Sequence, residues 1–159
     1  MVLKTKKFRF RQGVSLIEVL IAIVILAVVV IGASGYRYYS ALDSRKALMR
    51  STAARIGLLL CENWRGIKGA ETYDPMAHFG SELSITASTG PEEPEYFTLL
   101  GSYTVVSNCA DYYATLSWKD VSAGLRALNV VVAWAQRPQG ETILDDADKS
   151  FKLTIYTSN

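Results

Sequence analysis

Residues 1–42 of the chain read MVLKTKKFRFRQGVSLIEVLIAIVILAVVVIGASGYRYYSAL. The first twelve positions contain no acidic residue and five basic ones: Lys4, Lys6, Lys7, Arg9 and Arg11. An apolar run follows, and residues 19–33 contain no polar side chain. Because basic residues stay on the cytoplasmic side of a membrane, the chain after this run is predicted to face outward.

The apolar run spans residues 14–35, which is 22 residues. A helix rises about 1.5 Å per residue, so the run would extend roughly 33 Å and could cross a hydrocarbon core of about 30 Å. A secretory signal has a shorter apolar region that ends in a small-residue cleavage site. Here residues 34–35 lead directly into more helix-like sequence, so a secretory signal does not fit.

Glu18 lies inside the apolar run, near its predicted cytoplasmic end. An ionised carboxylate in hydrocarbon costs roughly 2.5–3.5 kcal/mol even on insertion scales, so such a residue usually has a partner. No lysine or arginine lies between Val14 and Tyr36 to supply one. An ordinary single-pass anchor fits the length of the run but does not explain this glutamate.

The stretch RQGVSLIE at residues 11–18 resembles the class III signal of type IV prepilins and pseudopilins. The resemblance implies that a prepilin peptidase removes a basic leader ending at Gly13 and methylates the new N-terminus at Val14. Glu18 then falls at the fifth mature position, where this family carries a glutamate. The implied partner of Glu18 is the N-terminal amine of a neighbouring subunit, since a buried carboxylate paired with a buried ammonium is tolerated.

This family usually has phenylalanine at the first mature position, where the chain has Val14. Minor subunits vary there more than major ones, so the resemblance favours a minor subunit. It also implies the partners and the location. The partners would be other pilin or pseudopilin subunits, the prepilin peptidase, and inner-membrane lipid before assembly. The N-terminus would be cytoplasmic, with the C-terminal domain periplasmic or extracellular and finally in a pilus or pseudopilus.

The helical pattern continues past the apolar run through residues 36–66. Apolar residues recur there at steps of three, four or seven, which is typical of an amphipathic helix. Gly66 and Gly69 are predicted to end this helix, and the glycines at 32 and 35 leave open a separate helix after a break. A cluster of three tyrosines and Arg37 at residues 36–39 fits either a membrane-interface belt or contacts between pilins.

The remaining residues predict a small antiparallel sheet. Residues 70–95 are loop-rich, with a short strand near 83–87, and residues 96–100 and 103–106 flank Gly101 and Ser102 as a turn or a bulge. Alternation predicts strands at 111–119 and 126–135, joined by a loop over 120–125, and a last strand that directs Phe151, Leu153 and Ile155 inward. The stretch ATLSWKD at residues 114–120, followed by LNVVVAW at residues 128–134, resembles the last hairpin of PilV-like minor pilins and I-type minor pseudopilins.

These expectations together predict an α+β protein with the pilin fold: a long N-terminal helix, membrane-spanning in its first half, packed on a small antiparallel sheet. The predicted parts are a cleaved leader at 1–13, a transmembrane and assembly helix at 14–35, an amphipathic helix at 36–66, and a globular domain at 67–159.

Cys61 and Cys109 are the two cysteines of the chain. A domain that matures in an oxidising compartment tends to bridge such a pair. Cys61 lies near the end of the helix, and Cys109 follows a strand that should pack on it, so a disulfide is predicted. Two buried free thiols are the alternative.

Other chemistry is weakly indicated. The chain after Gly13 contains twelve basic and fifteen acidic residues, so its net charge is −3. This charge argues against nucleic-acid binding. His78 lies in a loop with no catalytic neighbours in the sequence, so a surface or packing role is expected. The acidic stretch Glu141, Asp145, Asp146 and Asp148 lacks the pattern of an EF-hand, and a solvated loop is favoured over a calcium site. We therefore expect neither catalysis, nor a metal, nor a cofactor.

The sequence favours a minor structural subunit of a type IV pilus that polymerises through its N-terminal helix. Two alternatives stay open: a minor pseudopilin of a type II secretion system, and a membrane-anchored binding module that never assembles. The mature length favours the pilin.

Overall fold

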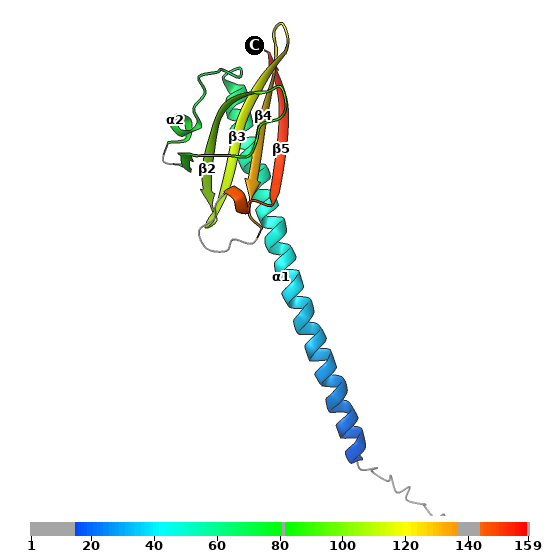
Figure 1. Ribbon diagram of the computed structural model, residues 1–159. Coiled ribbons are helices and arrows are strands. Elements are labelled where there is room, and N and C mark those ends of the chain that lie inside the picture. The colour runs from blue at the N-terminus through cyan, green and yellow to red at the C-terminus, as the bar shows by residue number, and fades with distance from the viewer. Residues whose placement is uncertain (1–14, 81, 137–143, 159) are drawn as a thin grey trace, which may run out of the picture. The chain divides into compact units, whose positions relative to one another are not determined.

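The computed structural model describes residues 15–80, 82–136 and 144–158 (Figure 1). The chain divides into two compact units, residues 1–43 and residues 44–159, which are described separately below. The described elements are α1 (Leu16–Gly66), α2 (Pro75–Phe79), β1 (Ser84–Ala87), β2 (Thr98–Ser107), β3 (Ala110–Ser122), β4 (Leu125–Trp134), a 3₁₀ turn (Leu144–Asp146) and β5 (Lys149–Ser158).

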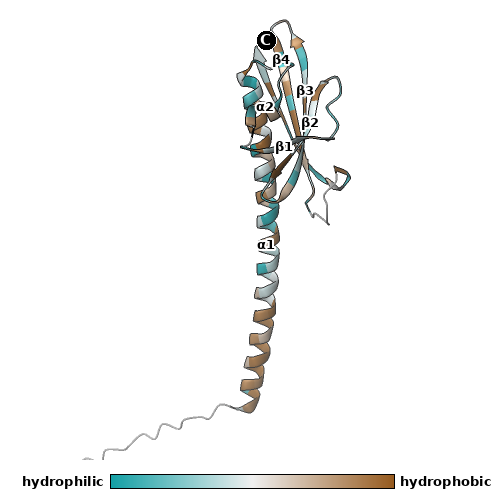
Figure 2. Cartoon of the chain, turned by 90° about the vertical axis from the view of Figure 1, so that its left-hand side faces the viewer, coloured by the Kyte–Doolittle hydropathy of each residue, from teal (hydrophilic) through white to brown (hydrophobic). Residues whose placement is uncertain are grey.

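The first unit contains the N-terminal part of α1. Residues 19–33 of this part are apolar on every side of the helix, as Figure 2 shows by hydropathy. A spanning segment in lipid must satisfy its backbone groups internally, and a helix does so. The helix is continuous past Gly32 and Gly35, and Ser34 Oγ donates to the carbonyl oxygen of Val30 at 2.8 Å. The alternative of a break at these glycines is therefore wrong.

The second unit contains a five-stranded sheet in the order β1-β2-β3-β4-β5 (Figure 1). Every neighbouring pair is antiparallel, so each strand pairs with the next one along the chain. Short connections suffice for such a meander, because adjacent antiparallel strands need only a hairpin loop. The α+β class predicted from the sequence is confirmed.

The core of the second unit lies between one face of the sheet and the part of α1 after residue 43 (Figures 1 and 2). The helix contributes buried residues at helical spacing: Met49, Ala53, Ile56, Leu60, Cys61 and Trp64. The central strands contribute alternate residues: Tyr112, Ala114 and Leu116 from β3, and Leu128, Val130, Val132 and Trp134 from β4. The buried residues of the helix repeat about every 3.6 positions and those of the strands every two, and the two sets pack together as the sequence predicted.

Two glycines allow the close packing of α1 and the loop after it. A Cβ at Gly57 would lie 3.3 Å from the Phe151 ring on β5, so the helix approaches the sheet closely there. Gly69 has φ of 67°, and its N–H donates to the Trp64 carbonyl oxygen at 3.0 Å. Lys68 before it is also left-handed, with φ of 59°, and its N–H donates to the Arg65 carbonyl oxygen at 2.9 Å, so the two residues together end the helix in a Schellman motif. A Cβ at Gly69 would come within 2.8 Å of Leu128 Cδ2.

The loop between β1 and β2 crosses the face of the sheet opposite α1 (Figure 1). The Ser88 N–H donates to the Ser102 carbonyl oxygen at 3.0 Å, and Thr115 Oγ1 donates to the Pro91 carbonyl oxygen at 2.7 Å. Thr115 is on the outward-facing side of β3 and is nonetheless fully buried. These contacts hold the loop in place against β2 and β3.

The structure corrects three details of the sequence-based expectations. Residues 96–106 do not form two strands, because β2 continues from Thr98 to Ser107 without a turn. Its pairing with β3 shifts in register between Leu99 and Gly101, so Gly101 lies at a bulge. The predicted loop at 70–95 contains the short helix α2, which Asp74 caps by accepting from the Met76 N–H at 2.9 Å. The loop predicted at 120–125 is shorter, because β3 ends only at Ser122 and β4 begins at Leu125.

Candidate functional site

The candidate site lies on the first unit, on the exposed apolar surface of α1. All of its large apolar side chains in residues 16–31 are exposed, from 47% at Val19 to 82% at Leu16. None of the most apolar stretch of this helix is buried within the protein. By length and composition this helix is able to cross a membrane. So large a contiguous apolar surface marks a membrane or protein contact.

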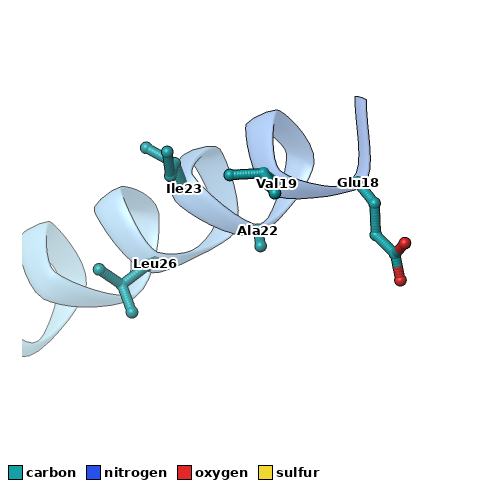
Figure 3. Close-up of a pocket in the computed structure, with 5 residues that line it drawn as sticks. All are labelled: Glu18, Val19, Ala22, Ile23 and Leu26. Atoms are coloured by element: carbon teal, nitrogen blue, oxygen red, sulfur yellow. The ribbon is translucent and has the colours of Figure 1, made fainter. Parts of the chain in front are cut away.

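Glu18 lies in the first turn of this helix (Figure 3). Its backbone N–H donates to the Ser15 carbonyl oxygen at 3.0 Å, and the N–H of Val19 donates to the same oxygen at 3.2 Å. A carboxylate in the first turn interacts favourably with the positive end of the helix dipole. The local structure thus tolerates Glu18 but does not by itself neutralise it.

The carboxylate of Glu18 has no cationic partner among the described residues. The next cation along the first unit is Arg37, nineteen positions later. At about 1.5 Å per residue this is roughly 28 Å along the helix, far beyond an ion pair. In a low-dielectric surrounding, Glu18 therefore needs a partner that the described part of its own chain does not provide.

Glu18 shares one surface of the helix with Val19, Ala22, Ile23 and Leu26. Figure 3 shows the carboxylate pointing outward beyond the apolar side chains. Ala22 is one turn after Glu18 and is the smallest member of the group, so the surface is hollowed beside the carboxylate. A neighbouring helix could approach here more closely than over a larger side chain.

The two predicted processing residues, Gly13 and Val14, lie outside the described residues, and so does the predicted leader at 1–13. The cleavage and methylation predicted at this position remain predictions from the sequence.

The predicted disulfide is absent, because Cys61 and Cys109 are both free. Cys61 is fully buried in the core under α1, whereas Cys109 is exposed in the β2–β3 turn, where its φ is 58°. Cys109 lies in the turn between β2 and β3, beyond the ends of the strands, and is therefore outside the core that contains Cys61. Burial raises the pKa of the Cys61 thiol to about 12, so it is protonated and unreactive at neutral pH.

His78 lies on α2, and its ring centroid is 5.3 Å from that of Tyr73. Tyr73 stacks on Trp64 at 5.9 Å and is 3% exposed, and burial raises the pKa of its hydroxyl. His78 thus packs against the edge of the core, and no metal-binding group of three or more His, Cys, Asp or Glu occurs in the described parts of the chain.

The acidic stretch lies only partly within the described residues, since Glu141 is outside them. Asp145 is exposed. Asp148 accepts from the Gln136 N–H at 2.9 Å and forms an ion pair with Lys149 at 3.1 Å. These bonds lower the pKa of the Asp148 carboxyl, first through Gln136 and then through Lys149. Asp148 therefore joins the start of β5 to the end of β4.

Sequence reasoning missed a buried arginine. Arg126 is 5% exposed; its Nε donates to Asp120 at 2.7 Å, and its Nη2 donates to Glu71 at 3.0 Å. Its Nη1 donates to the Gly69 carbonyl oxygen at 3.0 Å, and its guanidinium lies 3.9 Å from the Trp118 ring centroid. The Arg126 hydrogen bond lowers the pKa of Asp120. The one available signal was the alternation of side chains along the strand. Arg126 lies two residues before Leu128 and therefore falls on the same, core-facing side as Leu128, Val130 and Val132.

Residues 8–34 match the family model described as the prokaryotic N-terminal methylation motif. No curated protein and no solved structure gives a significant match to the chain. The motif covers Arg9 and Arg11, Glu18 and most of the apolar run. Together with the long helix and the antiparallel sheet, it supports a protein of the type IV pilin or pseudopilin class.

Proposed function

We propose that this chain is a minor structural subunit of a type IV pilus and that it assembles through the N-terminal part of α1. The observation that carries the proposal is Glu18, a carboxylate on a fully exposed apolar helix, without a cation among the described residues and inside a methylation motif. In this proposal the protein is structural rather than catalytic.

The proposed assembly follows from the charge on Glu18. Cleavage after Gly13 would create an amine at Val14, and methylation would keep it basic. The amine of a neighbouring subunit would pair with Glu18 as helices pack in the filament. Removing both charges from water is costly, and only a close pair offsets that cost. The pair would therefore set the register between helices whose other contacts are apolar and permit sliding.

The minor role is supported by Val14, which departs from the phenylalanine usual in this family. Inner-membrane insertion with the second unit outside follows from the five basic residues before the apolar run. A minor pseudopilin of a type II secretion system is the second candidate, because the same motif and the same helix serve both assemblies.

A deletion of the gene in its host separates these functions. Loss of surface pili with normal secretion of exoproteins is expected for the pilus subunit. Loss of exoprotein secretion with normal pili would assign the chain to the pseudopilus. Normal pili, normal secretion and absence of the protein from sheared filaments would contradict both and favour an anchored module. Expression of the wild-type gene from a plasmid is the control.

A further inference from the structure

The last strand, β5, has an outer edge that is unpaired within the described parts of the chain. It ends the strand order of the sheet and pairs with β4 alone (Figure 1). Asn129 Nδ2 on β4 donates to the Leu153 carbonyl oxygen at 3.3 Å, so this carbonyl points toward β4. The two backbone groups of a residue in an antiparallel ladder point the same way. Those of Lys152 and Thr154 therefore point away from β4, where another extended chain can bond them.

The two edges of the sheet differ in length. At one edge β1 has four residues, whereas β5 at the other edge has ten and contains no proline. The pairing of β4 with β5 shows no shift in register along its whole length. Proteins usually keep an exposed edge short or interrupt it with proline or a bulge, because a long regular edge is a template for a further strand. The length and regularity of β5 therefore favour a partner strand.

The strand β5 runs lengthwise beside α1. Lys149, at the start of β5, lines a hollow together with Arg50 of α1. Two positions later, the Phe151 ring lies 3.3 Å from where a Cβ at Gly57 would be. Gly57 is two helical turns beyond Arg50, so β5 follows α1 toward the C-terminal end of the helix.

Half-exposed apolar side chains line this edge on both elements. Ala54 and Leu58 follow Arg50 at steps of four, so they continue the side of α1 that lies beside the start of β5. Leu58 is exposed and Ala54 is half-buried. Three side chains on the core face of β5 are likewise only partly buried: Phe151, Leu153 and Ile155. A strand added beside β5 would place alternate side chains over Leu58 and extend the core.

The main chain and one charge define what can occupy this edge. Unpaired backbone groups along a strand bind an extended polypeptide, as in other cases of strand addition. Lys152 is exposed on β5 and has no ion pair among the residues that the structure describes. A carboxylate directly opposite it on an added strand would be favourable, and a like charge unfavourable. An extended segment with an acidic residue therefore fits the edge.

We propose that the open edge of β5 pairs with an extended, acidic segment of a different subunit of the pilin class. The inference rests on the proposed function, because a minor subunit has subunits of other kinds as neighbours. It adds a contact through the second unit, so the contact at Glu18 does not depend on it.

The test places the photoreactive residue p-benzoylphenylalanine at Tyr156, which is exposed on β5, in the full chain and in cells that form the native filaments. Irradiation should link the chain to another protein that carries the methylation motif, at a segment that contains Asp or Glu, as identified by mass spectrometry. Leu58→Lys should lower the yield about tenfold, because the added strand would bury an unpaired charge. Lys152→Pro should do the same, because it removes an outward N–H from an edge strand.

Leu59→Lys is the matched control for Leu58→Lys. The two leucines are 43% and 51% exposed, and Leu59 lies about 100° farther round the helix, so its substitution should leave the yield unchanged. Lys152→Thr keeps the N–H and should lose far less of the yield than Lys152→Pro. Slow reaction of the buried Cys61 with a maleimide verifies that each variant is folded.

The outcomes separate this contact from the proposed function. No link, links only to further copies of this chain, links to proteins without the motif, or equal yields from Leu58→Lys and Leu59→Lys would overturn the inference. A wild-type chain that enters sheared filaments without the link would do so too, and would leave the proposed function standing. A chain that forms the link in membranes but never enters filaments would support the edge contact and contradict the proposed function.

Discussion

At the scale of single residues, the positions around the start of α1 determine whether the chain can assemble. In the proposed pathway Gly13 sets the cleavage point, and Val14 then provides the amine that pairs with Glu18 of a neighbour. A small residue before the cut is what the class III resemblance requires, so a bulky charged residue there should block the peptidase.

We predict that the mature chain begins at Val14 with a methylated amine. Intact-mass measurement on protein extracted from membranes should give the mass of residues 14–159 plus one methyl group. Gly13→Glu should leave the full precursor in the membrane, and Gly66→Glu is a control far from the cut. A wild-type chain that keeps its leader in cells with an active peptidase contradicts the prediction.

The two cysteines give a second residue-scale prediction. In the folded protein without reductant, one thiol per chain should react rapidly with a maleimide, because Cys109 is exposed and Cys61 is buried with a raised pKa. Denaturation without reduction should release the second thiol. Cys109→Ser should remove the rapid reaction and leave the slow one. If no thiol reacts in the denatured, unreduced chain, the disulfide exists after all.

Asp120 should make folding stability depend on pH. Its pKa is lower in the folded state than its ordinary value of about 3.9, because Arg126 donates to it. Its contribution is therefore fully present above that ordinary value and is lost as the pH falls through the folded pKa. Melting curves of the detergent-solubilised chain from about pH 5 downward should fall more steeply for wild type than for Asp120→Asn. Equal slopes would show that the Arg126 bond contributes nothing.

At the scale of elements, periodicity alone predicted α1 and the central strands β3 and β4 in nearly the right places. It succeeded because Met49, Ala53, Ile56 and Leu60 repeat at helical spacing and meet alternate strand residues in one core. It could not place α2, since five residues are too few for a period and the Asp74 cap alone is a weak signal. It could not separate a turn from a bulge at Gly101, because both need the same residue type.

Gly57 tests how closely α1 packs on the sheet. Gly57→Leu should destabilise the protein by about 1–3 kcal/mol, because the side chain has no space beside Phe151. Gly66→Leu is the matched control, since a Cβ at Gly66 would meet nothing within 4 Å. Denaturant melts of both variants measure the difference. Equal stabilities would mean that the helix does not approach β5 as closely as described.

At the scale of the whole molecule, the chain contains two different parts. One is a helix whose apolar side chains are exposed, and the other is a domain that buries its own apolar core. The second unit is stabilised by contacts among its own residues. In the first unit, Glu18 and the apolar side chains have no such contacts among the described residues. The sequence predicted a boundary after residue 35, where the composition changes sharply, whereas the two compact units divide after residue 43. It could not predict the disulfide correctly, because the position of Cys109 depends on where a hairpin turns.

Glu18→Ala, followed in both membranes and sheared filaments, tests the proposed assembly most directly. Removing a charge from hydrocarbon should leave membrane insertion unchanged or slightly easier. Assembly should fail, because the amine of a neighbour is left buried and unpaired, a loss of roughly 3–5 kcal/mol. Glu62→Ala, which removes an exposed carboxylate from the same helix, should assemble normally. We therefore expect Glu18→Ala protein at wild-type level in membranes and missing from filaments; incorporation into filaments as efficient as wild type would contradict the proposed role of Glu18.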